Sequence, residues 1–214
     1  MAVVTVVGIL GVTHDPEMQA KYHYPLSLMQ ELIQEFAPDV ICGEVHPQSW
    51  RLYVETGEPY GIFGEIQEEY PRLIFPYCAR HGVKFMPVNW FEEDVFDVGP
   101  FDQFDAEAQH RLELELAQWN HKQMATWNHG RVPFNSSAYD EVTQALYAWL
   151  QEVNPEVQNI LWNARHYIML ARVNKAITEH PGARILCVHG ADHNYWYKRA
   201  LGKRSDIQLV YPLR

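Results

Sequence analysis

The sequence has few cysteines and no long apolar run. Its 214 residues include only Cys42, Cys78 and Cys187, and no C-x-x-C occurs. An odd number of widely spaced cysteines predicts buried, reduced thiols in a reducing compartment. The apolar run at residues 2–10 is too short to span a bilayer and lacks the flanks of a signal peptide. We therefore expect a cytoplasmic protein with no membrane partner.

Positive charge is also scarce. The chain has 17 Lys and Arg against 27 Asp and Glu, which gives a formal net charge of −10 with histidine neutral. Binding to nucleic acid or to an anionic membrane requires clustered Lys and Arg. We therefore expect neither partner. The negative balance favours solubility and a mild preference for cationic ligands or metal ions.

The pattern of apolar residues predicts one α/β domain that comprises residues 1–214. Strand-like runs lie at residues 3–10, 40–45, 83–88, 184–189 and 207–211. Helical spacing occurs at residues 26–36, 102–128, 139–153, 155–180 and 192–201, and further helical stretches are expected up to residue 80. Strands that alternate with helices indicate a mostly parallel central sheet flanked by helices on both faces. Residues 102–153 are expected as a helical insertion between the third and fourth strands, which could cap the sheet.

Residues capable of metal binding or proton transfer gather at the ends of four strands. The segments are Gly11-Val12-Thr13-His14-Asp15, Gly43-Glu44-Val45-His46, Asn89-Trp90-Phe91-Glu92-Glu93-Asp94 and His189-Gly190-Ala191-Asp192-His193. Ligands of open parallel sheets bind outside the carboxyl ends of the strands. The sequence therefore predicts one pocket, with the two Gly-x-x-His segments at its two poles.

The residue types in this pocket are those of a metal site. Imidazoles with a carboxylate are the usual ligands of Zn, Mn, Co or Fe, so His14, Glu44 and His193 are the first candidates. His46 and His189 are further candidates, either as ligands or as supports behind them. Glu44 could instead act as the general base on a bound water.

Each of these residues also has a purely structural interpretation. His14 could cap a turn with Asp15, and Glu44 could form a buried salt bridge to Arg165 that is compatible with a site role. Asp192 could either bind a metal directly or support the metal ligands from behind. The other histidines lack metal-ligand spacing and are expected mostly at the surface or in the core. They are His23, His81, His110, His121, His129, His166 and His180.

The paired motifs resemble the TraB/Tiki family, within the erythromycin esterase/ChaN-like superfamily. The matching pieces are Gly11-Val12-Thr13-His14, Glu44 after Pro38-Asp39-Val40, Arg165 in Asn163-Ala164-Arg165-His166, and Gly190-Ala191-Asp192-His193. The resemblance implies a divalent-metal-dependent hydrolase with His14, His193 and Glu44 in its active site. Only the motifs themselves are similar, although they occur in the same order and spacing over nearly the whole chain.

Three hypotheses follow for the function. The first is a metal-assisted hydrolase of a peptide, amide or ester bond in a peptide or small-molecule substrate, in which Arg165 steadies a carboxylate or developing negative charge. The second keeps the pocket and lets a histidine and a carboxylate activate water without a metal. The third is a protein that binds iron, haem or a small ligand without turnover, for which His193 and the tyrosines of Asn194-Tyr195-Trp196-Tyr197 are candidates.

Overall fold

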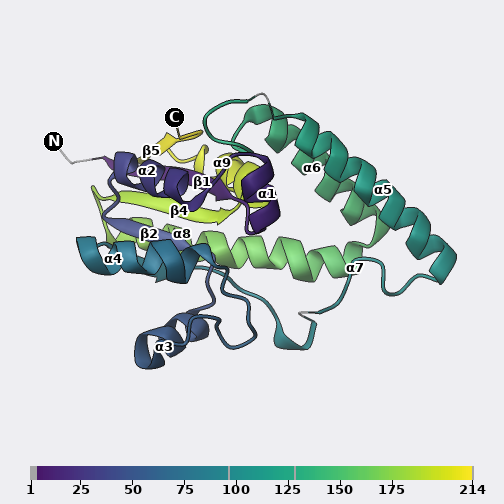
Figure 1. The fold of residues 1–214 in the computed structure, drawn as a ribbon, viewed down its shortest axis with the longest axis horizontal. Helices are drawn as coiled ribbons and strands as arrows, with labels where there is room; N and C mark the ends of the chain where they lie inside the picture. Colours follow the sequence, from purple (N-terminus) through teal and green to yellow (C-terminus); the bar gives the residue numbers. More distant parts are fainter. Residues whose placement is uncertain (1–3, 96, 128, 214) are drawn as a thin grey trace.

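The computed structural model describes residues 4–95, 97–127 and 129–213. Their strands form one five-stranded parallel sheet in the order β3-β2-β4-β1-β5 (Figure 1). The strands are β1 (Thr5–Val12), β2 (Val40–Gly43), β3 (Lys84–Pro87), β4 (Arg184–Gly190) and β5 (Ile207–Val210). The expected α/β fold with a mostly parallel sheet is confirmed.

Helices cover both faces of the sheet. The first half of the chain contributes α1 (Pro16–Lys21), α2 (Leu26–Phe36), α3 (Pro47–Thr56) and α4 (Phe75–His81). The second half contributes α5 (Ala106–Ala125), α6 (Ser137–Val153), α7 (Pro155–Gln158), α8 (Arg165–Glu179) and α9 (Asn194–Leu201). Short 3₁₀ turns occur at Glu93–Val95 and Ala191–His193.

The central strands are buried on both sides, as the continuous apolar run of β1 indicates. Leu10 and Val12 belong to a core shared with α2 and α4, whereas Val7 and Ile9 belong to a core shared with α8 and α9. This alternation follows from the two-residue period of a strand. Because β1 and β2 both pair with β4 in parallel, the carboxyl ends of these three strands lie at the same edge of the sheet.

The expected elements are present with shifted ends. β1 extends to residue 12 and β2 stops at residue 43, where 10 and 45 were expected, and residue 3 lies outside the described residues. The expected helix at 102–128 begins only at Ala106, because the Asp105 side chain caps it by accepting from Ala108 N, and residue 128 is not described. The short helix α1 was not expected from the sequence.

The spacing of apolar residues predicted one α-helix at residues 155–180, and this prediction is wrong. A π-helical segment, Asn159–Ala164, lies between α7 and α8, and a second one, Tyr70–Ile74, precedes α4. A π segment shifts the register of the side chains that follow it and is frequent near functional sites. Both segments border the site described below.

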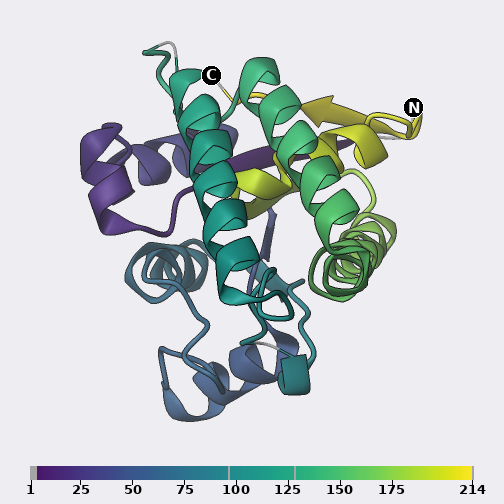
Figure 2. The ribbon, with the colours of Figure 1, turned by 90° about the vertical axis from the view of Figure 1, so that its right-hand side faces the viewer.

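Helices α5 and α6 stand together to one side of the sheet in Figure 1 and lie across the front of it in Figure 2. They share a small apolar cluster of their own that includes Leu112, Leu146 and Leu150. The loop between them is fastened to the first Gly-x-x-His segment, because Asn135 bonds both the N–H (2.9 Å) and the carbonyl (2.8 Å) of Gly11. This pair of helices therefore forms a roof over the carboxyl ends of the strands.

Candidate functional site

Glu44 follows directly after β2, and its backbone is held by a neighbouring tyrosine. The Glu44 N–H donates to the hydroxyl of Tyr70 at 2.7 Å, and that hydroxyl donates to the carbonyl of Val188 at 3.0 Å. The π segment that begins at Tyr70 places this hydroxyl between two strands. The backbone that carries the buried Glu44 side chain is thus held in place by hydrogen bonds.

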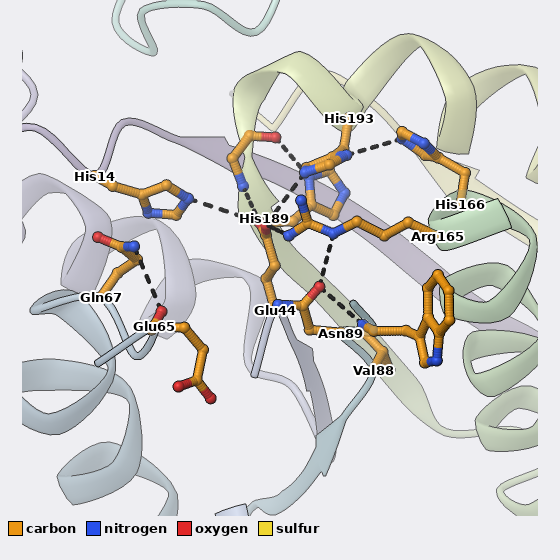
Figure 3. A network of polar contacts seen from close by, with 12 residues as sticks. His14, Glu44, Glu65, Gln67, Val88, Asn89, Arg165, His166, His189 and His193 are labelled. Carbon is orange, nitrogen blue, oxygen red and sulfur yellow. Dashed lines mark hydrogen bonds and ion pairs between the residues drawn. The ribbon is translucent and has the colours of Figure 1, made fainter. Parts of the chain in front are cut away.

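The Glu44 carboxylate is the shared centre of the site (Figure 3). Its Oε1 accepts from Arg165 Nη2 at 2.5 Å and lies 3.2 Å from His193 Nε2. Its Oε2 accepts from Gly190 N at 2.7 Å and lies 3.6 Å from His14 Nε2. Burial would raise the pKa of Glu44, but the positive charges of His193 and Arg165 outweigh burial and hold it well below its usual range. Glu44 is therefore an ionised carboxylate with its acceptor sites occupied.

His14 is held between two carboxylates. Its Nδ1 lies 2.6 Å from the buried Glu69 Oε1, while its Nε2 faces Glu44. Burial would lower the pKa of His14, yet the hydrogen bonds to Glu44 and Glu69 raise it to about 10. The end of β1 before it needs glycine, because a Cβ on Gly11 would lie 2.3 Å from the Asn194 side chain. At neutral pH His14 is a fixed imidazolium.

His193 is held by a second histidine. Its Nδ1 lies 2.8 Å from His166 Nε2, and His166 Nδ1 lies 2.7 Å from the carbonyl of Trp162. Burial and then the charge of His193 lower the pKa of His166 well below its usual range, so His166 is neutral. Its single proton must lie on Nδ1, since a carbonyl only accepts. His193 Nδ1 therefore donates to His166, and His193 Nε2 is left facing Glu44.

Arg165 is not a surface arginine. Besides Glu44, it donates from Nε to Asn89 Oδ1 at 2.9 Å, and Asn89 follows shortly after β3. Arg165 is the first residue of α8, at the end of the π segment that contains Trp162. The segments after β1, β2, β3 and β4 thus meet around one ion pair, as the strand-end argument predicted.

His46 and His189 do not join the Glu44 contacts. His46 is the N-cap of α3, where its Nδ1 accepts from Gln48 N at 3.4 Å, and its ring packs on Phe91 at 4.8 Å. The Nδ1 of the fully buried His189 lies 3.1 Å from the Gly190 carbonyl. Burial and the charge of His193 lower the pKa of His189 to about 3, so it is neutral. Within the described chain, neither histidine has a polar contact with Glu44.

A cavity of about 650 Å³ opens above Glu44. Its floor is formed by His14, Glu44, Gly190 and His193, and its roof comes from α5 and α6. The walls are mostly aromatic or apolar: Val12, Met18, Tyr22, Met124, Phe134, Tyr139, Tyr147, Trp162 and Ala191. The remaining polar lining is Thr13, Lys21, Asn120, His121, Gln123 and Asp192.

The contacts do not match the expected three-ligand metal shell. The two imidazoles approach different oxygens of Glu44, with His14 on the left and His193 on the right of the network in Figure 3. Arg165 and the Gly190 N–H already bind those oxygens. Among the residues described, no group of three or more His, Cys, Asp or Glu side chains is arranged to hold a metal ion. As arranged, these residues fit proton transfer better than one ion bound by all three.

Sequence reasoning missed two supporting residues of the site. Glu69 sits in a run of acidic residues with no spacing signal, and His166 was grouped with the surface and core histidines. The adjacency of His166 to Arg165, inside the motif that resembles the TraB/Tiki family, was the only signal that could have singled it out.

The chain was compared with protein-family models, curated proteins and solved structures. No protein-family model, no curated protein and no solved structure matches the chain. In the part of the chain that the structure describes, no helix has both the length and the apolar character that crossing a membrane requires. The resemblance to the TraB/Tiki family therefore stays a prediction from the motifs.

Proposed function

We propose that the protein is a hydrolase of ester, amide or peptide bonds that uses Glu44 and its histidines without a metal ion. The observation that carries the proposal is the Glu44 carboxylate on the floor of the cavity, contacted by Arg165, His14 and His193. Two imidazoles and a guanidinium within 3.6 Å of one carboxylate supply both a proton-transfer group and fixed positive charge. Those are the two requirements of acyl hydrolysis.

His193 is the proton-transfer group of this proposal. Its Nδ1 proton is fixed by His166, as the far nitrogen of a catalytic histidine is commonly fixed by a partner. Its Nε2 lies at the cavity floor beside Glu44 Oε1. With Nε2 unprotonated, His193 takes the proton of an attacking water and then delivers it to the leaving group.

His14 supplies positive charge for the oxyanion of the tetrahedral intermediate, whereas Arg165 acts on Glu44. His14 is the more direct candidate, because it lines the cavity and is an imidazolium at neutral pH. Arg165 acts mainly by neutralising Glu44, which it contacts at 2.5 Å. Fixed charge in a site with little water is typically worth a factor of about 10² to 10³ in kcat.

The metal-free version is favoured over the metal-assisted version because the atoms that would bind a metal already have other partners. A metal ion would have to displace the proton that His14 Nε2 directs at Glu44, and would compete with Arg165 and Gly190 N for the carboxylate. The metal-assisted hydrolase remains the alternative that the following experiment separates.

The test is hydrolysis of chromogenic esters, anilides and short peptides by protein stripped of metal with a chelator, with elemental analysis of the same sample. The proposal predicts hydrolysis that is insensitive to the chelator and is lost in Glu44→Gln and His193→Gln. His46→Asn is the matched control: it replaces a histidine that has no polar contact with Glu44 by a residue that also caps helices. Hydrolysis that appears only with added Mn, Co or Zn would overturn the metal-free version. No hydrolysis of any probe under either condition would count against a hydrolase.

A further inference from the structure

Asp192, inside the second Gly-x-x-His segment, is a carboxylate on the cavity wall that the proposed hydrolysis does not use. Its Oδ1 accepts from Gln123 Nε2 and from Tyr139 Oη, both at 2.7 Å, and its Oδ2 accepts from Tyr147 Oη at 3.1 Å. The donors come from α5 and α6, so Asp192 also fastens the roof to the catalytic turn.

Asp192 forms no ion pair with any residue that the structure describes. Its three hydrogen-bond donors are neutral, and among the described residues no Lys, Arg or His forms an ion pair with it. Burial, and then the charge of Asp192, raise the pKa values of Tyr139 and Tyr147 well above their usual range, so both hydroxyls stay protonated and donate. Glu44, the other carboxylate of the lining, is neutralised by Arg165 and the histidines.

One acceptor position of Asp192 is left for a ligand. A carboxylate offers about four acceptor positions, two on each oxygen. The donors named above take two on Oδ1 and one on Oδ2. The remaining position on Oδ2 adjoins Tyr147, whose ring stacks on Trp162 with centroids 3.6 Å apart. A cation there would lie against the Asp192 carboxylate beside the Tyr147 hydroxyl, and a primary ammonium group can donate a charge-assisted hydrogen bond to that carboxylate.

The aromatic wall connects this position to the proposed catalytic histidine. The Trp162 ring stacks on Tyr147 with centroids 3.6 Å apart and on His193 with centroids 4.8 Å apart. A substrate with an apolar body could therefore lie in the cavity along this stack of three rings, with its cleavable carbonyl near His193 and a cationic end near Asp192. The rim also carries Lys21, whose ammonium lies 5.3 Å from the centre of the Tyr22 ring.

We propose that Asp192 is a specificity-determining residue that binds a primary ammonium group of the substrate. The bond that is cleaved follows from the proposed function, on which this inference rests. The Asp192 site adds the substrate class: an ester, amide or peptide that carries a primary amine on an apolar or aromatic body. The competing role is structural, with Asp192 acting only as a fastening for α5 and α6.

Binding without turnover tests the proposal. Calorimetric titration compares 4-phenylbutylammonium with 4-phenylbutan-1-ol, which is similar in size and shape and lacks the charge. Wild type is expected to bind the ammonium compound roughly tenfold more tightly than the alcohol, the scale of one charge-assisted hydrogen bond. Asp192→Asn is expected to bind both equally, because it keeps an acceptor for the roof and loses the charge.

Tyr147→Phe is the matched variant that separates charge from fastening. It removes one donor of the roof but leaves the Asp192 charge, so the preference for ammonium is expected to persist. Melting temperatures of both variants report how far the roof is loosened. The proposal is overturned if wild type shows no preference or binds neither compound, if the preference survives in Asp192→Asn, or if Tyr147→Phe loses it equally.

The two proposals fail separately. His193→Gln is expected to keep the ammonium preference while it loses hydrolysis. Hydrolysis without any ammonium preference would remove the Asp192 proposal alone. A preference abolished by Asp192→Asn, in a protein that hydrolyses none of the probes, would remove the hydrolase alone.

Discussion

The two Gly-x-x-His segments have the same spacing but place their histidines in different environments. The first passes from β1 into an extended turn, and 27% of the His14 side chain is exposed. The second forms a 3₁₀ turn, and only 5% of the His193 side chain is exposed. The shared motif brings both imidazoles to Glu44 and does not determine what each can do there.

The difference lies in the partner of each Nδ1 atom. His14 is paired with the carboxylate of Glu69, which favours the imidazolium, whereas His193 is paired with the neutral ring of His166. The carboxylate partner keeps His14 an imidazolium at neutral pH. An imidazole partner fixes only the tautomer of the other and leaves its Nε2 proton exchangeable. We therefore assign charge stabilisation to His14 and proton transfer to His193.

The largest expected effect separates these two assignments. His193→Gln is expected to lower kcat about 10³-fold, within the range for loss of a general acid–base group. His14→Gln is expected to lower kcat about 10²-fold or less, because Arg165 remains near the carboxylate. The measurement is kcat and KM for both variants with one ester substrate. Equal losses would contradict the division of roles.

The sequence was sufficient to predict which strands end at the site, but not the partners that distinguish the two histidines. Apolar runs punctuated by Gly and Pro marked the strands, and parallel strands bring Glu44, Asn89 and Gly190 to one edge. His166 follows a π segment that shifts the register of α8, and Glu69 directly precedes the other π segment. These π segments leave no distinct sequence pattern. The pairing of Nδ1 atoms therefore could not be predicted from spacing.

A smaller effect, on the free energy of unfolding, should distinguish the first glycines of the two Gly-x-x-His segments, Gly11 and Gly190. A Cβ on Gly11 would lie 2.3 Å from the fully buried Asn194 side chain, so Gly11→Ala is expected to lower the free energy of unfolding by about 2 to 3 kcal/mol. A Cβ on Gly190 would lie 3.1 Å from His14 Nε2, at the end of a half-buried side chain. Gly190→Ala is expected to cost less than about 1 kcal/mol and mainly to reduce kcat.

Denaturant unfolding of both variants, with kcat measured beside it, checks this contrast. If Gly190→Ala were the more destabilising of the two, the close approach at Gly11 would not be the tighter constraint.

The smallest expected effect is on the pH dependence of stability. The pKa of His14 is raised from 6.5 to about 10, so its stabilisation is fully present below pH 6.5 and is lost as the pH rises through about 10. Allowing for partial exposure, we expect this loss to be about 1 to 2 kcal/mol. Glu69→Gln should reduce it, because the buried carboxylate that faces Nδ1 is gone.

Glu68→Gln is the control, since Glu68 is exposed and paired with Arg72. Unfolding free energies at pH 6.5 and pH 10 for wild type and both variants give the result. A loss between these pH values that is the same in Glu69→Gln and wild type would show that Glu69 does not hold His14 protonated.

The most direct test of the central claim is a nitrogen-15 NMR titration of the imidazole rings of His14 and His193. The account predicts that His14 carries protons on both nitrogens at pH 8 and titrates near 10, whereas His193 carries a proton on Nδ1. A neutral His14 at pH 8, or a joint shift of both rings when one equivalent of Zn²⁺ is added, would contradict it.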